Sequence, residues 1–280
     1  MSKYWSNQED KIILDNYESI GGIGCAQLLP NRTYKAILSR AEKFNLKSGI
    51  QSKYSHNKDF FSKPSLENCY YAGFIAADGY LSTRAHTLKI EIQTRDKRLL
   101  ENFKHATSYN GPIKDIQRAR HYNSTKHKTY YTNTICISGC QSWYNDLLKH
   151  FNITPQKTFR LQPPNLTNLE HIYAFIIGYI DGDGSLFWSY NKSRNKYDYY
   201  FTLEGASEEF IKWVEKQFRT IIDREQKIFT RTYINQANMY RLRYVNKNGI
   251  IITNFLQNIN TVYRLERKWN KLEHNPNITE

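Results

Sequence analysis

Two short segments of the chain, residues 71–79 and 176–184, end in the same pair of residues, an aspartate followed by a glycine. The aspartates are Asp78 and Asp183, roughly a hundred positions apart. Each follows an apolar run at helical spacing. We therefore expect each carboxylate to lie at the C-terminal end of a helix, in two copies of one structural unit.

Small residues within both runs predict that the two helices pack closely. They are Ala72, Gly73 and Ala76 in the first run and Ala174 and Gly178 in the second. Close packing would bring the two aspartates together at helix C-termini. Such an end disfavours a carboxylate by on the order of several tenths of a kcal/mol, and two adjacent carboxylates repel by roughly 1 kcal/mol or more. The arrangement calls for a cation, and hard oxygen ligands select Mg²⁺.

A metal at this place would suit phosphodiester chemistry, because it would bridge phosphates, lower the pKa of a bound water and stabilise the leaving oxygen. The predicted metal site comprises Asp78, Asp183 and their neighbours Ala77, Gly79, Gly182 and Gly184. The alternative is that each Asp-Gly pair merely ends a helix, with the glycine in the left-handed conformation. A single copy would favour that alternative, whereas two copies at domain-scale spacing favour the chemistry.

The charge balance points to a polyanionic partner. The 280 residues include 40 lysines and arginines against 26 aspartates and glutamates, a formal net charge of +14. Basic residues are interleaved with tyrosine, asparagine and glutamine. This mixture suits DNA, because cations meet phosphates while amides and phenols meet bases. Charge alone also fits a basic protein without a specific partner.

The elements around the two segments repeat. Each half, 67–165 and 166–280, reads as helix, strand, strand, helix, strand, strand, helix. This order predicts an α+β protein made of two pseudo-symmetric halves, each with an antiparallel sheet that has one polar face. In the strand at 88–94, apolar residues alternate with Lys89, Glu91 and Gln93.

The polar faces of the strands are the expected DNA-reading surface, since arginine and glutamine read guanine and adenine. A register slip of one residue would exchange the faces. The candidates in the first half are Ser82, Arg84, His86, Lys89, Glu91, Gln93, Arg118, Arg120 and Tyr122. The candidates in the second half are Ser189, Asn191, Arg194, Thr202, Arg231, Tyr233, Arg241 and Arg243.

Residues 1–46 read as a separate module of three short helices. Ser6 and Glu9 form a capping-box pattern at the first helix, and the third helix begins after Thr33. A basic third helix matches a helix-turn-helix plan, and the segment resembles the Myb-like family. Its expected DNA contacts are Tyr34, Lys35, Arg40 and Lys43. The alternative is a helical bundle that packs on the main domain.

Residues 47–66 are polar, basic and without periodicity, which predicts a linker. Lysines in this stretch, Lys53 among them, would track DNA phosphates.

Segments 71–79 and 176–184 both resemble the nine-residue signature of the LAGLIDADG homing endonucleases. The resemblance covers about 67–270. It implies that two motif helices join two half-domains, that the two sheets form a DNA-binding saddle, and that each aspartate serves the cut of one strand. It implies a monomer on a long, asymmetric duplex site, cutting across the minor groove to leave 3′ overhangs. Two or three Mg²⁺ ions are implied, with Mn²⁺ substituting and Ca²⁺ binding without turnover.

The same resemblance implies further catalytic residues in each half. Lys157 and Lys268 occupy the places of lysines that polarise the attacking water or neutralise charge on phosphorus. Gln93 fits the first glutamine position, and Glu204 is its nearest match in the second half. Ala76 departs from the pattern, because the family usually has an acid there. Ile177 departs as well, since the family usually has alanine.

Other classes fit less well. The histidines form no His-Asn-His pattern, and no Ser-His-Asp set or phosphate-binding loop is present. The four cysteines lack zinc-site spacing and read as reduced, mostly buried thiols. No apolar run of about eighteen residues and no signal-type N-terminus occur, so we expect an intracellular protein in a cytoplasm, nucleoid or organelle. The rival interpretation is a non-cleaving relative that acts as an RNA maturase or a DNA-binding regulator.

Overall fold

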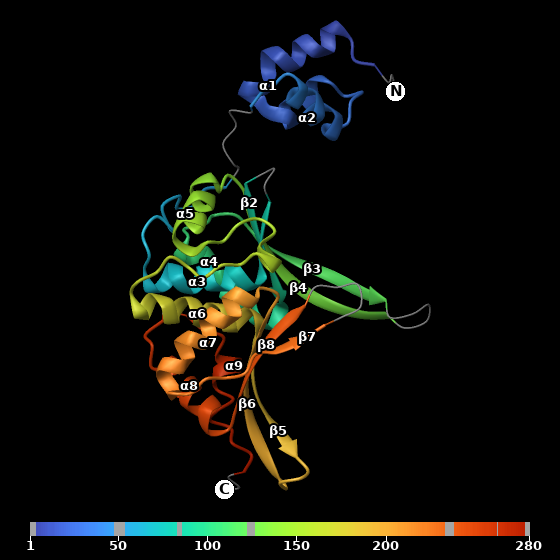
Figure 1. Cartoon of the computed structure of the whole chain (residues 1–280). Coiled ribbons are helices and arrows are strands. Elements are labelled where there is room, and N and C mark those ends of the chain that lie inside the picture. The colour runs from blue at the N-terminus through green and yellow to red at the C-terminus, as the bar shows by residue number, and fades with distance from the viewer. Residues whose placement is uncertain are drawn as a thin grey trace. The chain divides into compact units, whose positions relative to one another are not determined.

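The computed structural model describes residues 4–47, 54–82, 86–121, 127–232, 238–261 and 263–277. The chain divides into two compact units, Met1–Tyr54 and Ser55–Glu280 (Figure 1). Among the described residues, no helix combines the length and the apolar character that crossing a bilayer requires.

The N-terminal unit contains helices α1 (Asn7–Leu28) and α2 (Tyr34–Lys43). The capping box at Ser6 and Glu9 is present, because the Ser6 side chain accepts from the Glu9 backbone and the Glu9 carboxylate accepts in return. Gly21, with φ 62°, interrupts α1 with a kink. The core of this unit is formed by Ile13, Tyr17, Cys25, Leu29, Ile37 and Ala41.

Two arginines of this unit are held in internal contacts. The Arg40 guanidinium donates to both Asp10 carboxylate oxygens, at 2.7 and 2.5 Å, and lies over the Trp5 and Phe44 rings. Arg32 pairs with Glu9 and also lies over Trp5. Arg40, which we predicted as a DNA contact, thus joins α2 to α1 in the free protein, and its contact with DNA stays a prediction.

The second unit consists of two halves with the same element order. The first half contains α3 (Leu66–Asp78), β1 (Gly79–Ser82), β2 (Thr87–Gln93), α4 (Lys97–Ala106), β3 (Ile113–His121), β4 (His127–Ile137) and α5 (Gln141–Phe151). The second half contains α6 (Leu169–Asp183), β5 (Gly184–Asn191), β6 (Lys196–Gly205), α7 (Glu208–Ile222), β7 (Phe229–Arg231), β8 (Met239–Val245) and α8 (Lys247–Gln257). A short helix, α9 (Glu266–Trp269), follows near the C-terminus.

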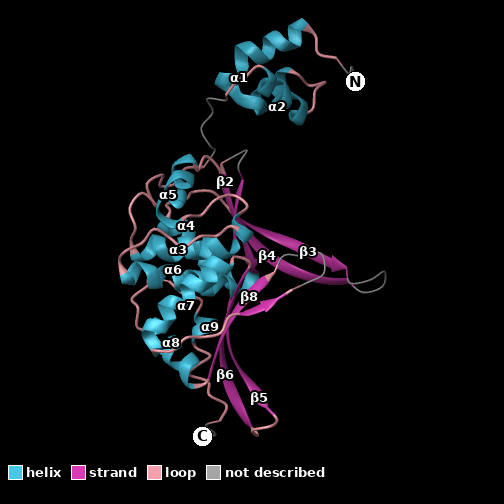
Figure 2. Ribbon diagram, in the orientation of Figure 1, coloured by secondary structure: helices cyan, strands magenta, loops and turns pink. Residues whose placement is uncertain are grey.

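Each half builds a four-stranded antiparallel sheet, with strand orders β1-β2-β4-β3 and β5-β6-β8-β7. The helices cover one side of the sheets and leave the other side open (Figure 2). In β2, Leu88, Ile90 and Ile92 are buried against the helices while Gln93 is exposed. The predicted α+β class, the two antiparallel sheets and this strand's alternation are confirmed.

The linker predicted for 47–66 is wrong from residue 55 onward. Phe61 is fully buried and its ring lies 5.3 Å from the Trp143 ring. The Trp143 indole donates to the Asn57 carbonyl at 2.9 Å, and the Asn68 amide donates to the Phe60 carbonyl at 2.8 Å. Burial of these aromatic side chains outweighs the polar composition of the stretch, so it packs as part of the larger unit.

Candidate active site

Helices α3 and α6 approach each other until their backbones touch. A Cβ atom on Gly73 would lie 1.9 Å from the Phe175 carbonyl oxygen, and one on Gly178 would lie 1.9 Å from the Tyr70 carbonyl oxygen. Only glycine leaves room for such an approach at these two positions. The close helix pair that we predicted from the small residues is present.

The aspartates lie at the adjoining ends of these helices. Asp78 is the last residue of α3 and Asp183 the last of α6. A Cβ atom on Gly182 would lie 2.3 Å from the Ala77 Cβ and 3.3 Å from Asp78 Oδ2, so the two helix ends meet. Both carboxylates reach solvent and line one cavity of about 520 Å³. The two aspartates therefore lie close together, as the sequence predicted.

The protein around the two carboxylates disfavours their charge. Partial burial, and then the negative charge of Asp78, raise the pKa of Asp183 to about 6. Burial likewise raises the pKa of Asp78, against the nearby charges of Lys268 and Lys157. The pair therefore carries a charge conflict that a bound cation would relieve.

The raised pKa predicts how stability varies with pH. Between about pH 4 and pH 6 the folded chain still holds a proton on Asp183, whereas the unfolded chain, with an ordinary pKa of 3.8, has already released it. The free energy of unfolding attributable to this group falls as pH rises through that window. Asp183→Asn should therefore be more stable than the unchanged protein at pH 7.5, with the gap shrinking at pH 4.5. Urea denaturation at both pH values measures the gap, and a gap independent of pH would contradict the assignment.

Gly79 and Gly184 follow the aspartates in an extended conformation. Their φ values are −76° and −88°, so the left-handed cap considered as the alternative is not formed. Glycine is required for another reason. A Cβ atom at these positions would lie 2.8 Å from the Ile75 carbonyl oxygen and 2.7 Å from the Ile180 carbonyl oxygen. Each chain therefore turns directly from a motif helix into the first strand of its sheet.

Two lysines neutralise the ends of the motif helices. The Lys157 ammonium donates to the Gly79 carbonyl. The Lys268 ammonium lies within hydrogen-bond distance, 2.6 to 3.2 Å, of four carbonyl oxygens at the C-terminal end of α6, those of Ile180, Asp181, Gly182 and Gly184. Burial lowers the pKa of both amines, while the charges of Asp78 and Asp183 oppose that shift. The lysines offset the partial negative charge of two helix C-termini.

This geometry changes the predicted metal site. Ammonium groups already lie at the Gly79 and Gly184 carbonyls, which accept hydrogen bonds from Lys157 and Lys268. The Gly182 carbonyl also accepts from Lys268, at 3.2 Å. Among the described residues, no three His, Cys, Asp or Glu side chains are grouped so that they could hold an ion alone. A metal ligand role for Asp78, Asp183, Ala77 and Gly182 therefore stays a prediction.

The other acid of the second motif, Asp181, anchors the C-terminal segment. Its carboxylate is buried and accepts from Tyr70 Oη at 2.7 Å, the Leu265 backbone at 2.8 Å and Trp269 Nε1 at 2.8 Å. These contacts hold Lys268, between Leu265 and Trp269, against the end of α6. Ala76 stands at the matching place in α3, so this anchor exists in one half.

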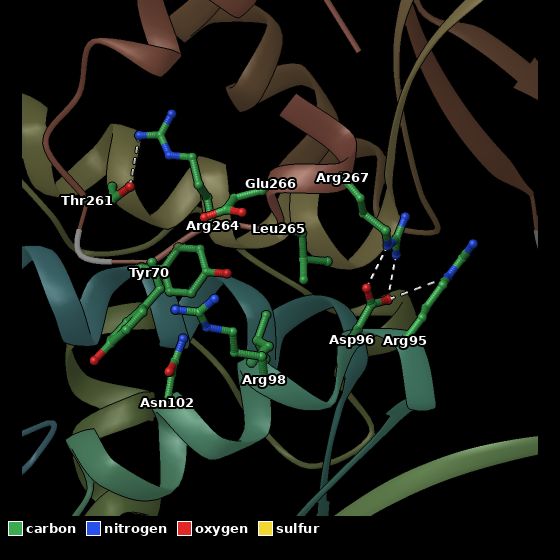
Figure 3. A pocket seen from close by; sticks show the side chains of 12 residues that line it. Tyr70, Arg95, Asp96, Arg98, Asn102, Thr261, Arg264, Leu265, Glu266 and Arg267 are labelled. Carbon is green, nitrogen blue, oxygen red and sulfur yellow. Dashed lines mark hydrogen bonds and ion pairs between the residues drawn. The ribbon is translucent and has the colours of Figure 1, made fainter. Parts of the chain in front are cut away.

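One ion pair joins the two halves beside the carboxylates. The Arg267 guanidinium, from α9, donates to both oxygens of Asp96 at 2.6 and 2.5 Å, and Arg95 lies 4.0 Å from the same carboxylate (Figure 3). Asp96 precedes α4 of the first half. Sequence reasoning missed this pair, because its members are 171 positions apart and neither belongs to a motif.

The strand register corrects the pairing of Gln93 with Glu204. Gly79 lies opposite Ile90 in the first sheet, and Gly184 lies opposite Leu203 in the second. Counting from these pairs, Glu204 matches Glu91, not Gln93. The amino-acid sequence does not reveal which residues are paired across the strands, so it could not align the two halves residue by residue.

Both matched glutamates are ion-paired on the open faces. Glu91 accepts from Arg118 at 2.8 and 2.6 Å and from Lys89 at 2.8 Å, which lowers the pKa of its carboxyl to about 2. Glu204 pairs with Arg241 of the neighbouring strand. Several predicted DNA-contacting side chains therefore hold one another in place in the free protein. Glu91 and Gln93 also line the cavity of the two aspartates.

The remaining sequence candidates fall into four groups. Antiparallel partners share a face of the sheet. The register therefore places the following residues on the open faces with Glu91 and Glu204: Ser82, the backbone of Arg120, Ser189, Thr202, Arg231 and Arg243.

The other candidates lie elsewhere. Asn191 and Arg194 bind Asp198 at the β5–β6 turn, and His86, with φ 42°, lies beside the Tyr144 ring. Tyr34, Lys35 and Lys43 are exposed on α2. Lys53, Arg84, Tyr122, Tyr233 and the Arg120 side chain lie outside the described residues.

The chain is similar to one family profile and to several solved structures. Residues 66–149 match the family profile of the LAGLIDADG-like domain. Similar solved structures include the homing endonuclease I-WcaI bound to its DNA recognition sequence (14% identity, 82% of this chain and 97% of that chain, TM-score 0.46). Another is I-DmoI in complex with DNA and Ca (12% identity, 78% of this chain and 99% of that chain, TM-score 0.44). A third is the N-terminal LAGLIDADG domain of DUF199/WhiA (17% identity, 75% of this chain and 91% of that chain, TM-score 0.40). A search of curated proteins finds no match.

Proposed function

We propose that this chain is a Mg²⁺-dependent, site-specific DNA endonuclease that cuts one phosphodiester in each strand of a duplex and leaves 3′ overhangs. The observation that carries the proposal is the pair of aspartates at adjoining helix ends. Asp78 and Asp183 share one cavity, and both have raised pKa values. Carboxylates forced together at negative helix ends serve no packing purpose, whereas they suit a cation that is shared with a polyanionic substrate.

The donor set fits Mg²⁺ only together with DNA. Mg²⁺ in phosphoryl-transfer sites is bound through one or two carboxylates plus substrate phosphates, rather than by an all-protein cage. Asp78 and Asp183 supply such carboxylates, and the described residues offer no third acidic or histidine ligand beside them. When bound, the metal supplies Lewis-acid activation of water and stabilisation of the leaving oxygen.

The chain's own residues bind and orient the substrate. The two open sheet faces carry the polar side chains that would lie along a duplex, and the net charge of +14 favours the phosphate backbone. Lys157 and Lys268 hold the backbone at the helix ends, which keeps both carboxylates directed into the cavity. Because both motifs lie in one chain and the halves differ in sequence, we propose a monomer acting on a long, asymmetric site.

The test uses the full chain, purified, with a plasmid that carries the DNA flanking its gene. With Mg²⁺ or Mn²⁺ we expect one linear product with 3′ overhangs, and with Ca²⁺ we expect binding without cutting. If the protein binds this plasmid specifically but no metal supports cutting, the non-cleaving interpretation, a regulator or an RNA maturase, replaces the endonuclease.

We also propose that the N-terminal unit contacts DNA through α2. Lys35 and Lys43 are exposed on this helix. Each lost phosphate contact lowers the slope of log affinity against log salt by about 0.9, so Lys35→Ala with Lys43→Ala should lower it by about 2. Fluorescence anisotropy over a salt series measures the slope. Lys11→Ala, an exposed lysine on α1, is the matched control and should leave the slope unchanged. An unchanged slope in the double variant would remove this unit from the DNA interface.

A further inference from the structure

A row of apolar side chains crosses the open face of the second sheet. Phe187 of β5 lies opposite Tyr200 of β6, which lies opposite Val245 of β8. The Phe187 and Tyr200 rings are stacked, with centroids 5.2 Å apart and planes at 15°. Phe187 is nevertheless 38% exposed. The row stands among charged and polar neighbours, with the Arg243 guanidinium 5.5 Å from the Tyr200 ring centre.

The matching row of the first sheet has the opposite chemistry. Counting from the pairs Gly79–Ile90 and Gly184–Leu203, the three positions that correspond to Phe187, Tyr200 and Val245 are Ser82, Thr87 and Ser138. All three carry hydroxyl groups, and the Thr87 and Ser138 hydroxyls lie 3.4 Å apart. Since the two halves share one fold, the fold does not require aromatic side chains at these positions.

An apolar row on a DNA-facing surface has one chemical counterpart in the major groove. The C5-methyl group of thymine is the apolar feature that distinguishes it from cytosine, and phenylalanine is among the side chains that contact it. We propose that the row Phe187–Tyr200–Val245 reads a thymine methyl group in the half-site that faces the second sheet. This inference rests on the proposed DNA binding and adds a specificity determinant to it.

The position of Phe187 along β5 predicts where the thymine lies. Phe187 stands four residues after Asp183 in an extended strand, which corresponds to roughly 13 Å at about 3.3 Å per residue. With about 3.4 Å per base pair, the thymine should lie about four base pairs from the bond cut beside Asp183. The matching position of the other half-site, opposite Ser82 and Thr87, should show no need for a methyl group.

The test replaces thymine with deoxyuridine, which removes only the methyl group. The tightest duplex is first selected from a random pool with the full chain. Each thymine of that duplex is then replaced singly, and binding is measured by anisotropy without metal. We expect about fourfold weaker binding at one position in the second half-site, equivalent to burial of one methyl group, ~0.8 kcal/mol. Equal binding of all deoxyuridine duplexes would overturn the proposal.

Matched variants show whether Phe187 recognises the thymine methyl group or only stabilises the sheet. Phe187→Ser should bind the thymine and deoxyuridine duplexes equally, whereas Phe187→Leu should still distinguish them. Tyr190→Ser is the control, because Tyr190 is an exposed aromatic on the same strand whose register places it on the opposite face. It should keep the fourfold difference. If Phe187→Ser keeps that difference, the row merely stabilises the strands and the proposal is wrong.

The outcomes also separate this inference from the proposed nuclease activity. Discrimination between thymine and deoxyuridine by a protein that never cuts DNA would support the reading row and refute the endonuclease. Efficient cutting without such discrimination would support the endonuclease and refute the reading row.

Discussion

Asp78→Asn and Asp183→Asn are each expected to lower the rate of double-strand cleavage by roughly a thousandfold or more, about 4 kcal/mol in the activation free energy. Each change replaces a carboxylate by an amide that cannot neutralise a divalent cation, while the side chain keeps its shape. Plasmid cleavage, followed separately for nicked and linear products, measures both cuts. If each aspartate serves one strand, the single variants should accumulate nicked circles and the double variant should do nothing.

Asp223→Asn is the matched control for these variants. Asp223 directly follows a helix, α7, but is exposed and adopts the left-handed conformation that asparagine tolerates well. It should cleave at the unchanged rate. Retention of both cuts in the double variant Asp78→Asn with Asp183→Asn would contradict the site, and equal losses in Asp223→Asn would point to a general effect of charge.

Gly73→Ala and Gly178→Ala are expected to cause the largest losses of stability, on the order of 3 kcal/mol or more each. A methyl group at either position would lie 1.9 Å from a carbonyl oxygen of the facing helix, so the backbones must separate. Separation would also move the two aspartates apart, and activity should fall even at temperatures where the variant stays folded. Urea denaturation and cleavage at a permissive temperature measure the two effects.

Gly249→Ala provides the control for a glycine-to-alanine change in a helix. Its added methyl group would meet the Tyr244 carbonyl oxygen at 3.0 Å and side chains at 3.3 Å and beyond, which small shifts can relieve. Alanine also favours the helix by about 1 kcal/mol. We expect a change in unfolding free energy of about 1 kcal/mol or less. A similarly small change at Gly73 or Gly178 would refute the tight helix interface.

Local patterns were sufficient to predict most of the second unit. The apolar spacing and the glycines of residues 71–79 and 176–184 indicated two closely packed helices, because only small residues permit such contact. The alternation in β2 indicated which face is buried. These features depend on residues close together in the chain, so a sequence can reveal them. The stretch from residue 55 to 64 was misread, because its two buried phenylalanines acquire partners only through the fold.

The two aspartates, the two lysines and the repeated order of helices and strands were predictable from the amino-acid sequence alone. The contacts of these residues became visible in the folded chain. Folding placed both lysines on helix carbonyls, paired Asp96 with Arg267, and matched Glu204 with Glu91. Helix and strand periodicity arise from neighbouring residues, whereas ion pairs and carbonyl contacts require atoms within about 3 Å that folding brings together from distant positions in the chain. The two carboxylates thus come together only because Gly73 and Gly178 let the two helices touch.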